Sequence, residues 1–312
     1  HVLSRRQRQM CIRDRPSEMI PAKELPQKWL NRLVDPRPKL AGMELTNCCI
    51  MGVLNVTPDS FSDGGSFDDP ASAVFQAENM LQNGADIIDV GGESTRPGAK
   101  KISAVLEIKR TASVIRAICA KTKATVSIDT RKAAVARAAV ESGAALVNDV
   151  SGLTFDPDLA PFCAKENLPV CVMHSQGLPE TMQDNPLYDD VVLDVYDFLD
   201  DQINRLNGQG IARNCIIADP GIGFGKTMAH NLALLNKISL FHSLGVPLLL
   251  GVSRKGFIGK ITQENVAEGR VIGSVSAALT GVSQGVQIFR VHDVRETRQA
   301  FDMWQTIMFG IK

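Results

Sequence analysis

Eight short apolar segments of this chain end on side chains that can bind ligands or move protons. Each segment is followed by a polar stretch, usually with glycine, serine or proline. One such end can be explained as a helix cap or a loop charge, but the recurrence of the pattern favours a single polar pocket. The eight residues at these ends are Asn55, Asp89, Asp129, Asn148, His174, Asp219, Lys255 and Arg290.

The first junction is the most informative. Ile50–Leu54 is long enough for one buried strand, and a loop of Pro, Asp, Ser and Gly residues runs from Asn55 to Gly65. A buried strand that opens into a polar loop forms one wall of the active site in many α/β enzymes. An ordinary turn would have a similar composition, so the repetition down the chain decides between the two interpretations.

Apolar runs alternate with segments of helical spacing along most of the chain. We expect strands at Ile50–Leu54, Ala85–Val90, Thr125–Ile128, Ala145–Val147, Pro169–Met173, Cys215–Ala218, Pro247–Val252 and Val286–Phe289. We expect helices at Ala71–Gln82, up to Ile118, and at Lys132–Ser142, Pro157–Glu166, Asp190–Asn207, Asn231–Ser243, Ala267–Val282 and Arg295–Phe309.

This alternation predicts an α/β protein with a single-domain (β/α)8 TIM barrel over residues 46–312. The strands are apolar throughout, as a parallel sheet buried on both faces requires. The C-terminal ends of all strands would then meet at one rim. An open doubly wound sheet is the alternative, but its first crossover normally carries a dinucleotide-binding glycine spacing, which the loop from Asn55 to Gly65 lacks.

The composition narrows the class of partner. Lys plus Arg and Asp plus Glu balance at 34 each, so no bulk charge indicates nucleic acid or membrane. The longest strongly apolar stretch, Leu244–Val252, is too short to span a bilayer. We therefore expect neither nucleic acid nor membrane as partner. The seven cysteines show no C-x-x-C spacing and read as buried reduced thiols of a cytoplasmic protein.

The N-terminal segment differs from the rest. Residues 1–15 are rich in arginine, and Gln7–Arg15 looks like a translated sequencing adapter, so we expect this segment to be non-native. Residues 16–45 are rich in proline and read as an extended or loosely packed lead-in to the barrel.

The junctions together resemble those of the dihydropteroate synthase family, the sulfonamide targets of folate synthesis. The matching stretches are Asn55–Gly65, Gly91–Ala99, Ser127–Arg131, Val147–Gly152, Val172–His174, Asp219–Lys226, Gly251–Gly259 and Arg290–His292. They occur in the family's order and cover about residues 46–312. The resemblance implies a pterin-binding barrel, a homodimer, and a transferase that joins 6-hydroxymethyl-7,8-dihydropterin diphosphate to p-aminobenzoate with release of diphosphate.

The resemblance and the residue chemistry together suggest a site for the diphosphate. Arg290 offers a bidentate fork for phosphate oxygens, and His292 lies two positions later on the same strand end. We expect Arg96 to contact the same group. Mg²⁺ takes few protein ligands and keeps phosphate oxygens and waters, so the amide oxygen of Asn55 suits this cofactor.

The pterin ring presents donors beside an acceptor. The Asp219 carboxylate can accept from the ring amino and N–H groups, while Asn148 can both donate and accept. Lys255 can donate to the ring carbonyl or N5, and Met173 is expected to contact the ring. In this family the reaction passes through a cationic pterin, and a fixed carboxylate stabilises such a cation; we assign Asp129 this role. The expected catalytic residues are Asp129, Lys255, Arg290 and His292.

We expect p-aminobenzoate between the loops after the first two strands and the helix that follows Ser253. The Ser253 hydroxyl and the positive end of that helix would hold its carboxylate. The side chains expected to surround the ring are Phe61, Thr95, Arg96, Pro97 and Phe224.

Three features are left without an assigned catalytic role. Gly225-Lys226-Thr227 mimics the end of a P-loop, but Pro220 stands where that motif needs glycine. His174 is expected to act only in support of other residues. Lys101–Arg110 is atypical of the family, and we expect it on a helix remote from the chemistry.

Two other functions are compatible with a pterin-binding barrel. A methyltransferase that passes a folate methyl group to a corrinoid protein has no diphosphate to hold, so Arg290 and His292 argue against it. A catalytically inactive pterin-binding module would have been favoured by loss of Asn55, Asp129 or Lys255, and all three are present.

Overall fold

The structure is a computed structural model, and it describes residues 21–57, 70–94, 101–177 and 182–310. The chain divides into two compact units, residues 1–35 and residues 36–312. The described part of the first unit contains a short 3₁₀ helix, η1 (Ala22–Glu24), and helix α2 (Gln27–Val34), which buries none of its residues. The segment predicted to be non-native, residues 1–15, lies outside the described residues.

The second unit is the predicted (β/α)8 barrel. Its strands are parallel and follow the order β6-β5-β4-β3-β2-β1-β8-β7. A parallel bridge between Ala218 and Leu248 joins the two ends of the sheet. The strands are β1 (Cys49–Asn55), β2 (Ile87–Gly91), β3 (Thr125–Asp129), β4 (Leu146–Asp149), β5 (Val170–Met173), β6 (Ile216–Asp219), β7 (Leu249–Leu250) and β8 (Ile288–Val291).

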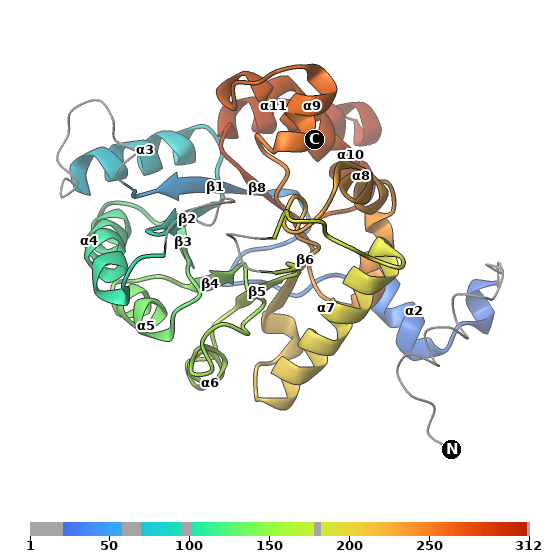
Figure 1. The fold of residues 1–312 in the computed structure, drawn as a ribbon, viewed down its shortest axis with the longest axis horizontal. Coiled ribbons are helices and arrows are strands. Elements are labelled where there is room, and N and C mark those ends of the chain that lie inside the picture. The colour runs from blue at the N-terminus through green and yellow to red at the C-terminus, as the bar shows by residue number, and fades with distance from the viewer. Residues whose placement is uncertain (1–20, 58–69, 95–100, 178–181, 311–312) are drawn as a thin grey trace. The chain divides into compact units, whose positions relative to one another are not determined.

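The helices of this unit lie around the outside of the strands (Figure 1). They are α3 (Pro70–Gln82), α4 (Ala104–Lys121), α5 (Ala133–Glu141), α6 (Leu159–Lys165), α7 (Val191–Gly208), α8 (Met228–Asn236), α9 (Gly256–Thr262), α10 (Val271–Ser283) and α11 (Val294–Phe309). Short 3₁₀ segments are η3 (Arg213–Cys215), η4 (Ile238–Leu244) and η5 (Glu268–Arg270). Among the described residues, none of the helices is both long and apolar enough to cross a membrane.

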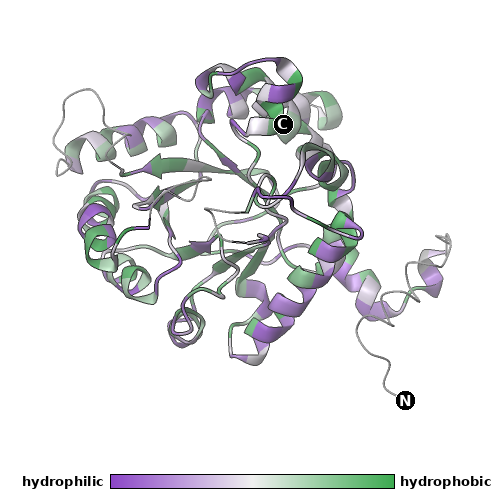
Figure 2. Ribbon diagram, in the orientation of Figure 1, coloured by the Kyte–Doolittle hydropathy of each residue, from purple (hydrophilic) through white to green (hydrophobic). Residues whose placement is uncertain are grey.

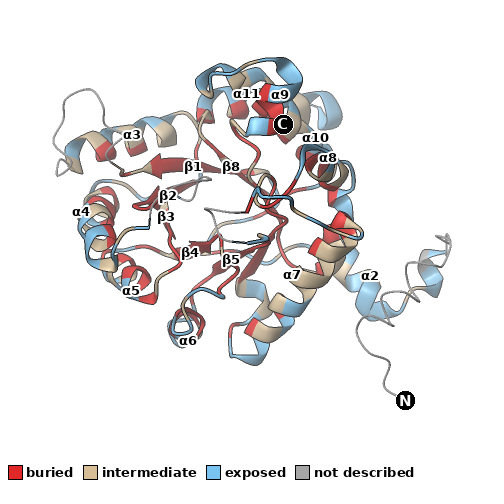
Figure 3. Ribbon diagram, viewed as in Figure 1, coloured by how far each residue is buried: buried red, intermediate tan, exposed pale blue. Residues whose placement is uncertain are grey.

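The strands are almost entirely buried and hydrophobic (Figures 2 and 3). Two groups of apolar side chains pack on their opposite faces. The larger group fills the space between strands and helices. The smaller group fills the N-terminal end of the barrel, where Leu40 and Leu45 join residues from the strands. Its members are Leu40, Leu45, Cys49, Met51, Ile87, Leu146, Cys171, Ile217, Leu249 and Ile288.

A two-residue step separates this apolar floor from the polar rim. Side chains at positions i and i+2 of a strand point to the same face. In five strands, an apolar floor residue is therefore followed, two positions later, by a side chain at the C-terminal end of the barrel interior. The pairs are Ile87 and Asp89, Leu146 and Asn148, Cys171 and Met173, Ile217 and Asp219, and Ile288 and Arg290.

The element boundaries agree with the predictions to within a few residues, with four differences. Residues 16–45, expected as an extended or loosely packed lead-in, contain helix α2, and Leu40 and Leu45 pack in the apolar floor of the barrel. The helix expected over Asn231–Ser243 is wrong, because α8 ends at Asn236 and a 3₁₀ segment follows. Its buried residues Ile238, Phe241 and Leu244 recur every third position, which suits the three residues per turn of a 3₁₀ helix. The helix expected from Ala267 begins as the 3₁₀ segment η5, and β7 has only two residues.

Candidate active site

Four polar side chains from four strands meet in the barrel mouth, and we call them the mouth cluster: Asp89, Asp129, Asn148 and Arg290. The Arg290 guanidinium donates from Nε to Asp89 Oδ2 at 2.6 Å and from Nη2 to Asp129 Oδ2 at 2.8 Å. Asn148 Nδ2 donates to Asp89 Oδ2 at 3.1 Å. The expected convergence of Asp129, Asn148 and Arg290 is thus seen. Asp89 was recognised as a strand end but given no role, although it lies at the centre of the cluster.

Not every buried oxygen of the mouth cluster has a hydrogen-bond partner. Two carboxylates share one arginine, and Asp89 Oδ1 and Asp129 Oδ1 have no hydrogen-bond partner among the described residues. Burial raises the pKa of Asp129 to about 7; the Asp89 charge adds to this shift, and Arg290 opposes it. Burial alone would lower the pKa of Arg290, but the two carboxylates outweigh it and raise that pKa. Buried oxygens without partners are suited to a ligand that donates hydrogen bonds or carries positive charge.

Asp219, at the end of β6, lies in the same mouth. Its Oδ1 accepts from Gly221 N at 2.7 Å, and its side chain is buried. Burial raises the pKa of Asp219 to about 6. The hydrogen bond from Gly221 and the charges of nearby lysines, of which Lys255 has the largest effect, lower the pKa but do not outweigh burial. The ammonium of Lys255 lies 4.1 Å from the centre of the Phe224 ring. The structure therefore brings Asp219, Lys255 and Phe224 to one side of the mouth, as expected.

Lys226 is a buried cation that sequence reasoning missed. Its ammonium contacts His174 Nδ1 at 2.9 Å and donates to His174 O at 3.3 Å and to Phe224 O at 3.0 Å. Burial lowers the pKa of Lys226 to about 7, and burial with the Lys226 charge lowers the pKa of His174 to about 2. His174 is thus a neutral acceptor for Lys226.

The loop between Asp219 and Lys226 packs tightly on the end of β5. Gly221 has a φ of +68°, and a Cβ at that position would overlap the His174 carbonyl oxygen. Only glycine fits such a close approach. The glycines that made this loop resemble a P-loop are therefore explained by close packing of the backbone. The lysine at the end of the glycine-rich loop was the sequence signal that could have identified Lys226.

Ser253 and His292 are in direct contact. The Ser253 hydroxyl oxygen accepts from His292 N at 3.1 Å and lies 3.1 Å from His292 Nδ1. Ser253 is buried, and its hydroxyl contacts His292, the residue that directly follows β8. The helix expected after Ser253 is α9, which begins at Gly256.

Asn55 and Asp129 face each other across Gly91. A Cβ placed on Gly91 would lie 3.4 Å from Asn55 Oδ1 and 3.8 Å from Asp129 Oδ2. Because Gly91 has no side chain, Asn55 Oδ1 and Asp129 Oδ2 both lie at the edge of the mouth. Met173, the last residue of β5, is buried. The remaining predicted site residues lie outside the described residues: Phe61, Thr95, Arg96 and Pro97.

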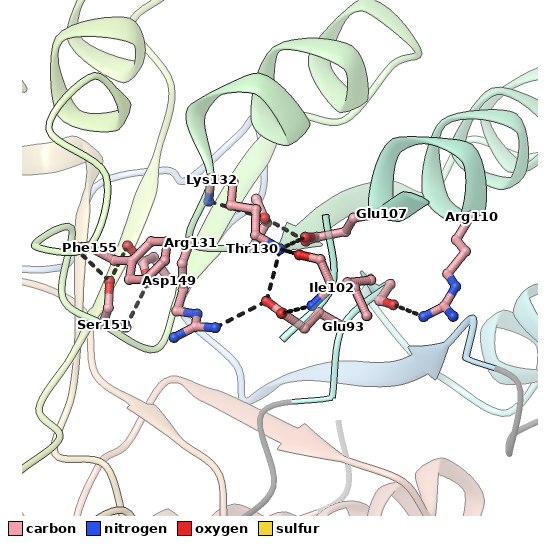
Figure 4. A network of polar contacts seen from close by, with 11 residues as sticks. Glu93, Ile102, Glu107, Arg110, Thr130, Arg131, Lys132, Asp149, Ser151 and Phe155 are labelled. Atoms are coloured by element: carbon pink, nitrogen blue, oxygen red, sulfur yellow. Dashed lines mark hydrogen bonds and ion pairs between the residues drawn. The ribbon is translucent and has the colours of Figure 1, made fainter. Parts of the chain in front are cut away.

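A second buried ionic group lies between the ends of β2 and β3 and helix α4, and we call it the loop-base cluster: Glu93, Glu107, Arg131 and Lys132 (Figure 4). Glu93 Oε2 pairs with Arg131 Nη2 at 3.1 Å and Lys132 Nζ at 3.2 Å, and Lys132 also pairs with Glu107 Oε2 at 2.6 Å. The two carboxylates and two cations balance. Glu93 Oε1 also accepts from Ile102 N at 2.9 Å, so every carboxylate oxygen of Glu93 is used.

The loop-base cluster reaches the mouth through Thr130. The Thr130 hydroxyl donates to Glu107 Oε1 at 2.6 Å, and Thr130 directly follows Asp129. The stretch Lys101–Arg110, which we expected to be remote from the chemistry, contributes Glu107 to this contact from α4. That expectation is therefore wrong for Glu107, because α4 packs beside the end of β3.

Comparison with known proteins agrees with this geometry. The family of pterin binding enzymes matches residues 51–292. The dihydropteroate synthase of Escherichia coli strain K12 is 45% identical over 258 residues, covering 83% of this chain and 91% of that protein. A dihydropteroate synthase from Yersinia pestis, solved with a sulfonamide drug complex, is 44% identical with a TM-score of 0.81, covering 85% of this chain and 96% of that one.

A third relative extends the comparison. The dihydropteroate synthase of Xanthomonas albilineans, solved with 4-aminobenzoic acid, is 42% identical with a TM-score of 0.83, covering 88% of this chain and 98% of that one. The similarity thus spans nearly the whole length of these proteins and includes the strand ends that form the mouth. The chain therefore belongs to the dihydropteroate synthases, within the family of pterin binding enzymes.

Proposed function

We propose that this chain condenses 6-hydroxymethyl-7,8-dihydropterin diphosphate with p-aminobenzoate, giving 7,8-dihydropteroate and diphosphate. The mouth cluster is the observation that carries the proposal. Two buried carboxylates share one arginine there, and each keeps an oxygen without a partner among the described residues. This arrangement suits a ligand with several N–H donors that becomes cationic during the reaction.

The pterin ring would lie against Asp219 and Asn148. The ionised Asp219 carboxylate is an acceptor with both oxygens, so N–H groups of the ring would stabilise its ionised form and lower the pKa that burial raises. Asn148 supplies an amide that can donate and accept. Lys255, beside the Phe224 ring, would donate to the ring carbonyl or N5, and Met173 would supply apolar contact.

Asp129 would stabilise the charge that develops when diphosphate leaves. The carbon–oxygen bond to diphosphate breaks, the electron pair leaves with diphosphate, and the pterin methylene becomes electron-poor. The p-aminobenzoate nitrogen then forms the new carbon–nitrogen bond and gives up a proton. A buried carboxylate already held by Arg290 at 2.8 Å needs little reorganisation to stabilise the cation.

The diphosphate would be held by Arg290, His292, Arg96 and Asn55. No cluster of three or more His, Cys, Asp or Glu side chains in the described ranges could hold a metal by itself. The Asn55 amide oxygen at the edge of the mouth nevertheless fits Mg²⁺, which takes one or two protein oxygens and completes its shell with phosphate oxygens and water. When bound, Mg²⁺ would neutralise charge on the leaving diphosphate.

The p-aminobenzoate would lie beside Phe224 and Ser253. We propose that Phe61, Thr95, Arg96 and Pro97 complete this pocket, as the family resemblance implies. A structure of the Xanthomonas albilineans relative contains 4-aminobenzoic acid, and one of the Yersinia pestis relative contains a sulfonamide drug complex. Sulfonamides mimic p-aminobenzoate, so they should compete with it for this chain as well.

The test is release of diphosphate that depends on p-aminobenzoate. The purified chain, given the pterin diphosphate and Mg²⁺, should release diphosphate only when p-aminobenzoate is added. Sulfamethoxazole should raise the apparent KM for p-aminobenzoate without changing kcat. Release that ignores p-aminobenzoate, or inhibition that p-aminobenzoate cannot relieve, would exclude the proposed reaction.

Three further properties are proposed. The family resemblance implies a homodimer, the cysteine pattern suggests a cytoplasmic location, and the adapter-like sequence of residues 1–15 suggests that this segment takes no part in folding or catalysis. Deleting residues 1–15 should leave the melting temperature and kcat unchanged. Sedimentation of the full chain at several concentrations tests the dimer. A melting temperature several degrees lower after the deletion would show that the segment packs on the enzyme.

A further inference from the structure

Arg254 has an unusual backbone conformation between two residues of the active site. Its φ is +59°, in the left-handed region, and it separates Ser253 from Lys255. For a residue with a bulky side chain this conformation is energetically unfavourable. Such strain persists only where the surroundings impose it, and it concentrates at functional sites.

The polar groups of Arg254 are held on all sides. Its backbone N donates to Ser274 Oγ at 2.8 Å, and its carbonyl oxygen accepts from Arg270 Nη1 at 3.1 Å. The guanidinium forms a bidentate pair with Asp293, Nη2 to Oδ1 at 2.6 Å and Nε to Oδ2 at 3.1 Å. Exposed Glu268 approaches Nη1 at 3.5 Å. Because Asp293 pairs with both Nε and Nη2 of Arg254, we assign the Arg254 guanidinium to this ion pair and give it no contact with substrate.

The pair joins the two loops that carry the predicted diphosphate and p-aminobenzoate contacts. Asp293 directly follows His292, whose backbone N donates to Ser253 Oγ at 3.1 Å. On the other side of Arg254, the Lys255 ammonium lies over the Phe224 ring. The left-handed turn therefore sends the side chains of Ser253 and Lys255 to different walls of the mouth.

We propose that the Arg254–Asp293 ion pair is a positioning device that fixes Ser253 and Lys255 relative to His292. The inference rests on the proposed function, since its readout is turnover. It assigns neither residue a contact with substrate. The ion pair stabilises a strained turn, and the turn fixes the positions of Ser253, Lys255 and His292. Fixed geometry of this kind controls the rate of the chemical step, because small displacements of reacting groups are costly.

The test begins with Arg254→Ala and Asp293→Ala. Each should lower kcat about 10- to 100-fold, with a smaller change in KM for the pterin diphosphate, because the substrate-facing residues themselves remain. The double variant should lose no more than the larger single loss, since both changes break one pair. Independent, multiplying losses would overturn the proposal.

Arg254→Gly separates positioning from strain. Glycine adopts a φ of +59° freely, so this variant should melt at or above the temperature of Arg254→Ala. Its kcat should nevertheless stay as low, because the ion pair is still absent. Recovery of wild-type kcat in Arg254→Gly would show that Asp293 merely compensates for strain, and the proposal would fall.

The matched control is a second Arg–Asp pair at the opposite end of the barrel. Arg298 Nη2 pairs with Asp86 Oδ2 at 2.7 Å, and the Arg298 side chain is about as exposed as that of Arg254, at 22% against 25%. Arg298→Ala should lower the melting temperature and leave kcat unchanged. An equal kcat loss in the control would overturn a specific role for Arg254. If the wild type releases no diphosphate, the proposed function fails; if wild type and variants turn over equally, only the positioning role fails.

Discussion

The mouth cluster and the loop-base cluster use the same kinds of side chain, and both are largely buried, yet their electrostatics are opposite. In the mouth, Asp89 and Asp129 share one cation, and the pKa of Asp129 is raised to about 7, mainly by burial. At the loop base, burial would raise the pKa of Glu93, but the Ile102 N–H bond, Arg131 and Lys132 outweigh it and lower that pKa.

The difference shows that burial alone does not make a site reactive. A buried carboxylate with all its oxygens paired is fixed and inert, whereas one with an unused oxygen and too few cations is ready for a ligand. The two carboxylates of the loop-base cluster have all their oxygens paired before substrate arrives, although Arg131 Nε has no partner among the described residues, whereas the mouth carboxylates would be completed by the substrate. Buried ion pairs contribute little net stability, so the loop-base cluster serves mainly to fix the base of the loop after β2.

The largest effect should follow from Arg290→Ala. The change removes the only cation that pairs with Asp89 and Asp129 in the described structure. We expect kcat/KM to fall about 10³-fold and the free energy of unfolding to fall by about 3–5 kcal/mol. Steady-state kinetics and urea unfolding measure the two effects.

The matched change at the loop base is Arg131→Ala. Arg131 pairs with Glu93 and stacks on Phe155, 4.5 Å from the ring centre. We expect a comparable loss of stability with a much smaller loss of kcat/KM. If Arg131→Ala reduces kcat/KM as deeply as Arg290→Ala, the functional distinction between the two clusters is wrong.

Asp129→Asn should have the next largest effect. It removes the charge that stabilises the pterin cation and keeps the shape of the side chain, so kcat should fall about 10²-fold. Stability should hold or rise, because the amide no longer repels Asp89. The expected result is turnover slowed by about this factor in steady-state kinetics, with pterin binding largely retained in calorimetry. An unchanged kcat would remove Asp129 from the chemistry.

The sequence predicted the barrel and most of the mouth because both depend on local patterns. A polar residue at the end of an apolar run identified Asp129, Asn148, Asp219 and Arg290 without any contact information, and the family resemblance suggested their roles. The pairing of Asp89 with Arg290 could not be read in the same way, because 201 residues separate them. It depends on β1 lying between β2 and β8 in the closed sheet.

The supporting residues were harder to find for the same reason. Lys226 bonds to His174 across 52 residues, and Lys132 bonds to Glu107 across 25. No local sequence motif marks either contact. Any buried lysine needs hydrogen-bond acceptors, and only the fold determines which acceptors lie beside it. The left-handed turn at Arg254 was also invisible, because arginine carries no preference for positive φ.

Glu93→Gln makes at the loop base the same chemical change as Asp129→Asn in the mouth. The amide oxygen can still accept from Ile102 N, but the charge facing Arg131 and Lys132 is lost. We expect the free energy of unfolding to fall by about 1.5–3 kcal/mol, with kcat nearly unchanged. A kcat loss as large as that of Asp129→Asn would show that the loop-base cluster takes part in the reaction.

The smallest effect should be the pH dependence of stability, which the two clusters shift in opposite directions. The folded-state pKa values of Asp129 and Asp219 are raised, to about 7 and about 6, above the unfolded value. Their contribution to stability is therefore full below about pH 3.9 and is lost as pH rises through 6 and 7. The pKa of Glu93 is lowered, so its contribution is full above about pH 4.3 and is lost only in stronger acid.

These windows do not overlap, so thermal melting from pH 3.5 to 8 can separate them. The contribution of the mouth carboxylates to wild-type stability should be lost between about pH 4 and 7, by about 2–4 °C in Tm for each kcal/mol, on top of the opposite change from His174, whose pKa is lowered. Asp129→Asn should flatten this carboxylate slope. Glu93→Gln should keep the carboxylate slope, and it should no longer show the loss of stability in acid that protonation of Glu93 causes. A pterin ligand that donates N–H groups to Asp219 should also flatten the slope, because it lowers the pKa that burial had raised. If the slope between about pH 4 and 7 is the same in wild type, in Asp129→Asn and with pterin bound, the mouth carboxylates are already fully paired in the free enzyme, and the contrast between the two clusters does not hold.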